Sequence, residues 1–199
     1  TTKLGFKRYE LINTFYGNNA PGRMNDEALA AELFNISPAE LDIITGETAI
    51  DVSLPLQEDG TCVIKDLLET TRLSYIDLLQ LLETYFLNPV EEAKRAIEII
   101  QIDERQGEEE EQILTCNLDK LLLEGADDEW LNKAVRFVRL WKKTGWDIFD
   151  LDRILTALKP EGTDNEDLDI NNQLIISLAN IENIRRLLNI TLGQAASLF

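Results

Sequence analysis

Histidine is absent from all 199 residues of the sequence. Its absence excludes Ser-His-Asp and Cys-His nucleophilic sites, zinc sites with histidine ligands and the most common general base of enzymes. No glycine-rich phosphate loop is present either, and nothing singles out a pair of acids for hydrolysis. We therefore expect no enzymatic activity, no catalytic residue, no cofactor and no bound metal.

Cysteines and long apolar runs are also scarce. Cys62 and Cys116 are the two cysteines, too few for a disulfide framework, so two unpaired thiols or a single bridge are the alternatives. Polar residues interrupt every apolar run well before the roughly 18 to 20 residues that cross a bilayer. We expect no membrane contact by this segment.

Acidic residues outnumber basic ones, 37 to 19, which gives a net charge of −18. Such a surface repels the phosphate backbone, so nucleic acid is excluded as a partner. A hydrophobic content of 44% is sufficient for a real core.

Most of the sequence has helical periodicity. Asn25 caps an expected helix over 25–34, and a second runs over 73–86. Asn88-Pro89 ends that helix and begins another over 89–100, because proline suits a first turn. The clearest helix spans 127–143.

This pattern divides the sequence into four parts. They are an N-terminal extension (1–24), a first helical block (25–103), an acidic connection (104–126) and a second helical block that ends within a helix (127–199). For 112–124 a short β-hairpin, an extended turn and a helix remain open.

The helix over 127–143 has one apolar and one basic side. The basic side consists of Lys133, Arg136, Arg139, Lys142 and Lys143. It is either a docking face for an acidic partner or a set of charges that neutralises neighbouring acidic helices.

Four segments share one helix–turn–helix pattern, in which a capping residue is followed three positions later by a residue that completes a capping box. The caps are Ser37, Ser74, Asp147 and Thr191, and their partners are Glu40, Asp77, Asp150 and Gln194. Trp146 holds the hydrophobic position before its cap. The residues two positions before the caps are Asn35, Arg72, Gly145 and Asn189. Asparagine and glycine tolerate the left-handed conformation that ends helices, whereas Arg72 departs from this rule. We predict an all-α fold, an irregular array of αα-corners in a helical bundle or shell fragment.

Two other patterns favour structural roles. Asp164, Glu166, Asp167 and Asp169 lie in an acidic stretch but lack the spacing of an EF-hand calcium loop, so we expect a solvated loop. Trp130, Trp141 and Trp146 fit core packing better than a ligand groove.

The stretch "RFVRLWKKTGWDIFDLD" (136–152) resembles a signature of the Tc toxin A component and the related Salmonella virulence plasmid A protein family. The stretch "LSYIDLLQLLETYFLNP" (73–89) resembles a second segment of that family, and the similarity extends over about residues 25 to 199. The resemblance implies a fragment of the α-helical shell around a translocation channel, in a secreted or cell-surface bacterial toxin. The implied partners are the rest of the parent chain, further copies of it and other toxin complex components. The alternative is an adaptor module that binds a partner through the basic face of 133–143.

Overall fold

A computed structural model describes residues 10, 25–91, 94–101, 117–159 and 168–198. The described residues up to 49 and from 136 onward group into unit 1, and those from 50 to 135 into unit 2. Eight α-helices and two small sheets make up this described part, so the fold is mainly helical, as expected, with an added β component. None of the described helices is long and apolar enough to span a membrane.

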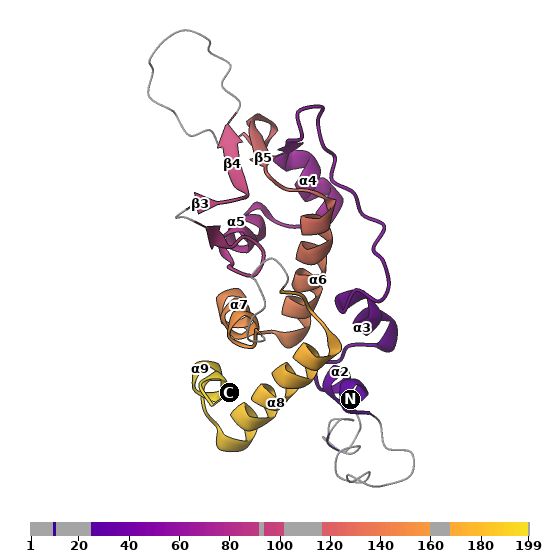
Figure 1. The fold of residues 1–199 in the computed structure, drawn as a ribbon, viewed down its shortest axis with the longest axis vertical. Helices are drawn as coiled ribbons and strands as arrows, with labels where there is room; N and C mark the ends of the chain where they lie inside the picture. Colours follow the sequence, from indigo (N-terminus) through magenta and orange to yellow (C-terminus); the bar gives the residue numbers. More distant parts are fainter. Residues whose placement is uncertain (1–9, 11–24, 92–93, 102–116, 160–167, 199) are drawn as a thin grey trace. The chain divides into compact units, whose positions relative to one another are not determined.

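Unit 1 is entirely helical in the described part. It contains α2 (Asp26–Leu33), α3 (Pro38–Ile44), α7 (Ile148–Ala157), α8 (Asn172–Leu188), α9 (Leu192–Ala196) and the end of α6 (Asp128–Thr144). α2 lies beside α8, and α9 contacts both α7 and α8 (Figure 1). Asn25 caps α2 as predicted, accepting a hydrogen bond of 2.9 Å from the backbone N–H of Ala28. The fully buried side chains of unit 1 include Ile44, Phe137, Leu140, Ile148 and Leu151.

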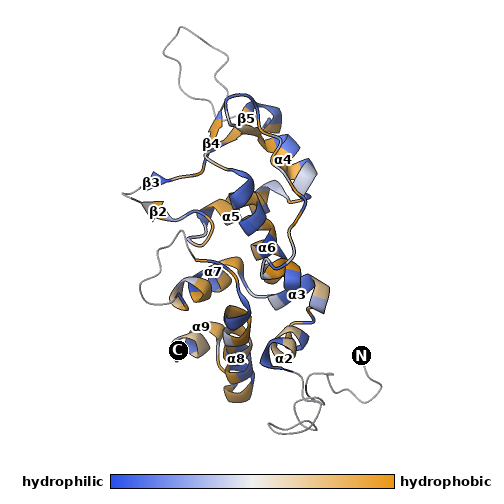
Figure 2. Cartoon of the chain, turned by 45° about the vertical axis from the view of Figure 1, so that its right-hand side comes forward, coloured by the Kyte–Doolittle hydropathy of each residue, from blue (hydrophilic) through white to orange (hydrophobic). Residues whose placement is uncertain are grey.

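Unit 2 combines two helices with short strands. The helices are α4 (Ile64–Thr71) and α5 (Tyr75–Glu83), and the start of α6 also belongs to it. β1 (Cys62–Val63), β5 (Leu121–Glu124) and β4 (Glu98–Gln101) form an antiparallel sheet in that order, and η1 (Leu118–Lys120) precedes β5. β2 (Val90–Glu91) pairs with β3 (Lys94–Arg95) in a separate hairpin. Figure 2 shows hydrophobic and hydrophilic residues together along α4, α5 and α6, which fits their partial burial.

The predicted helix over 89–100 is wrong, because this stretch forms β2, β3 and β4. The buried Asn88 side chain donates to the carbonyls of Leu82 and Ile97 and accepts from the Ile97 N–H. Arg95 donates to the carbonyls of Leu82 and Glu83 at the end of α5 and to those of Thr84 and Asn88 in the turn that follows. These bonds satisfy the backbone at the end of α5 and hold the following chain in an extended path.

A strand does occur in the region left open over 112–124. β5 pairs with β4 on one side and β1 on the other, so its partners lie elsewhere in the sequence rather than in a local hairpin. Gly125 follows β5 with φ +83°, and a Cβ there would stand 2.1 Å from the carbonyl oxygen of Ala96. Only glycine fits this close approach. The part of the acidic connection over 104–116, which includes Cys116, lies outside the described residues, whereas Cys62 is an unpaired, buried thiol.

Candidate functional site

The five basic residues of α6 do not form one exposed face. Arg136 is buried, with 6% of its surface exposed, and Lys143 is half-buried. In unit 2 the Lys133 ammonium lies 4.7 Å from the centre of the Phe86 ring, a cation–π distance. Lys142 is the exposed member of the set.

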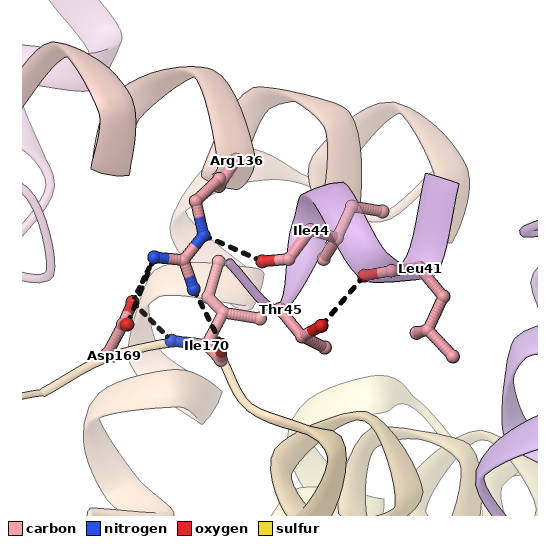
Figure 3. A network of polar contacts seen from close by, with 6 residues as sticks. All are labelled: Leu41, Ile44, Thr45, Arg136, Asp169 and Ile170. Atoms are coloured by element: carbon pink, nitrogen blue, oxygen red, sulfur yellow. Dashed lines mark hydrogen bonds and ion pairs between the residues drawn. The ribbon is translucent and has the colours of Figure 1, made fainter. Parts of the chain in front are cut away.

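Arg136 binds two segments of unit 1 that are distant from α6 in the sequence (Figure 3). Its Nε donates to the carbonyl oxygen of Ile44 at 2.9 Å, and its Nη2 donates to the carbonyl oxygen of Ile170 at 2.7 Å. Its Nη1 lies 2.9 and 3.0 Å from the two carboxylate oxygens of Asp169. The guanidinium therefore joins the end of α3 to the segment that leads into α8, as the fork geometry of arginine permits.

Gly46 and Asp169 complete this arrangement. A Cβ on Gly46, whose φ is +80°, would stand 3.0 Å from the guanidinium carbon of Arg136, so glycine leaves room for that group. Asp169 also accepts a hydrogen bond of 2.7 Å from the Ile170 N–H, which fixes its carboxylate. Of the acids considered as calcium ligands, Asp164, Glu166 and Asp167 lie outside the described residues. Within the described part no group of three or more ligand side chains is placed to hold a metal.

Lys143 ties the end of α6 to the turn between α2 and α3. Its ammonium lies 2.7 Å from the Glu40 carboxylate and donates to the carbonyl oxygen of Asn35 at 3.0 Å. Glu40 is the residue expected to complete the capping box of Ser37, but the Ser37 side chain accepts from the Glu40 N–H without a reciprocal bond. Here the partner carboxylate binds a lysine of another helix.

The left-handed conformation occurs at all four positions that precede the caps by two residues. Their φ angles are +55° at Asn35, +56° at Arg72, +65° at Gly145 and +52° at Asn189. Arg72 adopts this conformation although its side chain disfavours it. The four turns therefore share one backbone conformation at this position, although the residues there are different.

The four caps differ in detail. Ser74 with Asp77 and Thr191 with Gln194 form reciprocal capping boxes. Asp147 accepts from the N–H of Phe149 at 2.9 Å. Its expected partner Asp150 binds Arg153 instead. Each of the four predicted side chains caps its helix, and two of the four reciprocal bonds form.

The tryptophans have structural partners. Trp130 Nε1 donates to the carbonyl oxygen of Leu87 at 3.1 Å, and Trp141 Nε1 donates to that of Trp146 at 3.0 Å. The Trp146 ring meets Phe34 edge to face, with ring centres 5.9 Å apart. These contacts satisfy the indole N–H groups of Trp130 and Trp141 and pack the Trp146 ring.

Sequence reasoning missed a buried carboxylate in α8. Glu182 is 2% exposed and binds Arg185 at 2.7 Å and Arg186 at 2.6 Å. Burial raises the pKa of Glu182, but hydrogen bonds and charges from both arginines outweigh it, so the pKa lies below its usual 4.5. The spacing of Arg185 and Arg186 three and four residues after Glu182 was the available signal.

Comparison with known protein families, curated proteins and solved structures finds no match for this chain.

Proposed function

We propose that this chain is a non-catalytic scaffold module, a segment of the α-helical shell of a large pore-forming subunit resembling the Tc toxin A component. The observation that carries the proposal is the use of Arg136 and Lys143, two residues of the stretch that resembles the family, to join helices of unit 1. Residues that serve only to dock a partner would instead be exposed. Here they stabilise the scaffold itself.

The four turns support an irregular array of αα-corners as the finer arrangement of this scaffold. A left-handed residue followed two positions later by a cap fixes the direction in which each second helix leaves. In this proposal the partners are the remainder of the parent chain, further copies of it and other toxin complex components, and the parent is secreted or displayed on a bacterial surface.

The mass of the natural protein tests the proposal. An antibody raised against this chain should detect, in denaturing gels of the source cells and their culture medium, a polypeptide far heavier than 22.6 kDa. Particles isolated with the same antibody should show a central channel by negative-stain microscopy. A natural polypeptide of about the mass of this chain, or particles without a channel, would refute the shell assignment.

Two basic residues of α6 favour the alternative function, an adaptor that binds an acidic partner. Arg139 Nε is buried without a hydrogen-bond partner among the described residues, and Lys142 is exposed. An adaptor should bind an acidic helical peptide, and the double variant Arg139→Glu/Lys142→Glu should lose that binding. The scaffold proposal expects no binding by either protein. Saturable binding abolished in the double variant would favour the adaptor.

A further inference from the structure

Two of the four turns in unit 1 and unit 2 that precede a cap have nearly the same sequence, and both belong to unit 1. The turn over 33–37 reads L-F-N-I-S and the turn over 187–191 reads L-L-N-I-T. The asparagine of each is left-handed, with φ of +55° at Asn35 and +52° at Asn189. The N–H of the following isoleucine bonds to the same carbonyl position of the preceding helix, at 2.9 Å in the first turn and 3.2 Å in the second. The two turns therefore present equivalent side chains in equivalent directions.

The turn at the end of α6 covers the turn over 33–37. The Trp146 ring meets the Phe34 ring edge to face, with ring centres 5.9 Å apart. Lys143 donates to the carbonyl oxygen of Asn35 at 3.0 Å and lies 2.7 Å from the carboxylate of Glu40. One αα-corner thus docks on another through the aromatic residue directly before its cap and a donor four positions before that cap.

The turn over 187–191 is uncovered at the same positions. Leu33 and Phe34 are each 4% exposed in the covered turn. Leu187 and Leu188, their counterparts, are 83% and 55% exposed. A single exposed leucine is ordinary on a protein surface, but here two neighbours expose positions that an equivalent turn of the same fold buries. The comparison between the two turns therefore selects an αα-corner as the cover.

The charges beside the uncovered turn differ from those beside the covered one. Gln194 stands in the position of Glu40, and its side chain completes the cap of α9. Arg185 and Arg186 share the single carboxylate of Glu182, so this end of α8 has a positive net charge. A lysine on the docking corner would find no carboxylate to pair with and would be repelled by this charge. An uncharged donor fits the position better.

We propose that the turn over 187–191 is a docking site for a further αα-corner, with an aromatic residue directly before its cap and an uncharged hydrogen-bond donor four positions before that cap. The aromatic ring packs on Leu188 as the Trp146 ring packs on Phe34. The donor bonds to the carbonyl oxygen of Asn189. The inference rests on the array of αα-corners in the proposed function, but not on the mass or the channel of the parent, so the two proposals fail in different experiments.

A labelled peptide tests the docking by fluorescence anisotropy. The probe peptide is residues 136–157 with the change Lys143→Gln and a fluorescein label, so it carries the end of α6, its turn and α7. The full chain should bind it saturably below about 1 mM. The additional change Trp146→Ser in the peptide should weaken binding at least about tenfold, and a peptide that retains Lys143 should bind at least about threefold more weakly. No saturation up to about 1 mM, or binding indifferent to Trp146→Ser, would overturn the proposal.

Two variants of the full chain locate the site. Leu187→Asp/Leu188→Asp should weaken binding of the probe peptide at least about tenfold and leave the chain folded, because both side chains are exposed. The matched control is Ile76→Asp/Leu79→Asp, which places the same charges on α5 at side chains that are 66% and 39% exposed. This control should bind like the unmodified chain. Urea unfolding checks that both variants are folded, and equal binding by the two variants would overturn the proposal.

Discussion

Arg136 donates from Nε to the carbonyl oxygen of Ile44, 2.9 Å away, at the last residue of α3. Carbonyls at a helix end have no partner within the helix, so this bond satisfies one of them with a charged donor. The same guanidinium is paired with Asp169 and bonded to Ile170, so the buried charge is neutralised and its donors are used. Arg136 thus organises unit 1.

Replacing Arg136 by methionine should lower the free energy of unfolding by about 3 kcal/mol, because the carbonyls of Ile44 and Ile170 lose their donor and Asp169 loses its counter-ion. Arg136→Lys should recover only part of this, since an ammonium cannot reproduce the fork. Urea unfolding at neutral pH gives the difference. Lys142→Met, an exposed site on the same helix, is the control and should change stability little. Equal effects of the two methionine variants would contradict the role given to Arg136.

Asn88 plays a similar role in unit 2, where its buried side chain bonds to the backbone of two other segments. Asn88→Leu keeps much of the side-chain volume but removes three hydrogen bonds in a fully buried site, to Leu82 and Ile97. We expect a loss of about 3 kcal/mol in the free energy of unfolding. Asn171→Leu, which removes the exposed cap of α8, should cost about 1 kcal/mol and serves as the comparison. A smaller loss for Asn88→Leu than for Asn171→Leu would show that the buried amide is dispensable.

The helix predicted over 89–100 does not form, and Asn88 is one physical reason. Apolar residues at helical spacing and a proline in the first turn predict a helix, and both signals are local. Asn88 and Arg95 act on carbonyls that sequence spacing does not connect to them, and β4 finds its partner β5 across more than fifteen residues. Tertiary contacts therefore override the local preference.

The helix caps at the turns were easier to predict from the sequence than the strands over 89–100. Caps are local, so Ser74 and Thr191 could be identified with their partners from spacing alone. The basic side of α6 was identified as a stripe, but periodicity places a residue on a side of a helix without saying what covers that side. The burial of Arg136 depends on α3 and on the segment before α8, and no spacing rule connects these to α6.

Arg72 offers a site where the sequence opposes the backbone. A non-glycine residue in the left-handed region costs about 1 kcal/mol or more, and the φ of Arg72 is +56°. Arg72→Gly should therefore raise the free energy of unfolding by up to about 1 kcal/mol, the strain relieved exceeding the added flexibility of the unfolded chain. Thermal unfolding measures the gain. Glu69→Gly, an exposed helical position in α4, should instead lose about 1 kcal/mol. A loss at both positions would show that Arg72 makes a compensating contact.

Glu182 gives the chain a stability term that depends on pH. The pKa of Glu182 in the folded protein lies below 4.5. The folded state therefore stabilises the ionised carboxylate more than the unfolded state does. The resulting stability is fully present above about pH 4.5 and is lost as the pH falls through the lowered pKa.

Glu182→Gln should therefore destabilise the protein by about 2 kcal/mol at neutral pH, where the variant lacks the charge that binds Arg185 and Arg186. At about pH 3 the deficit should shrink, because the carboxyl group of the unfolded chain, whose ordinary pKa is 4.5, is then protonated, and its proton must be released for Glu182 to bind the two arginines. Urea unfolding at the two pH values separates this effect from a general loss of packing, which would be independent of pH. Glu69→Gln, an exposed carboxylate on α4, corrects for the change in net charge. If Glu182→Gln costs as much at pH 3 as at neutral pH, the two arginines do not stabilise the charge of Glu182, and its burial is explained by shape alone.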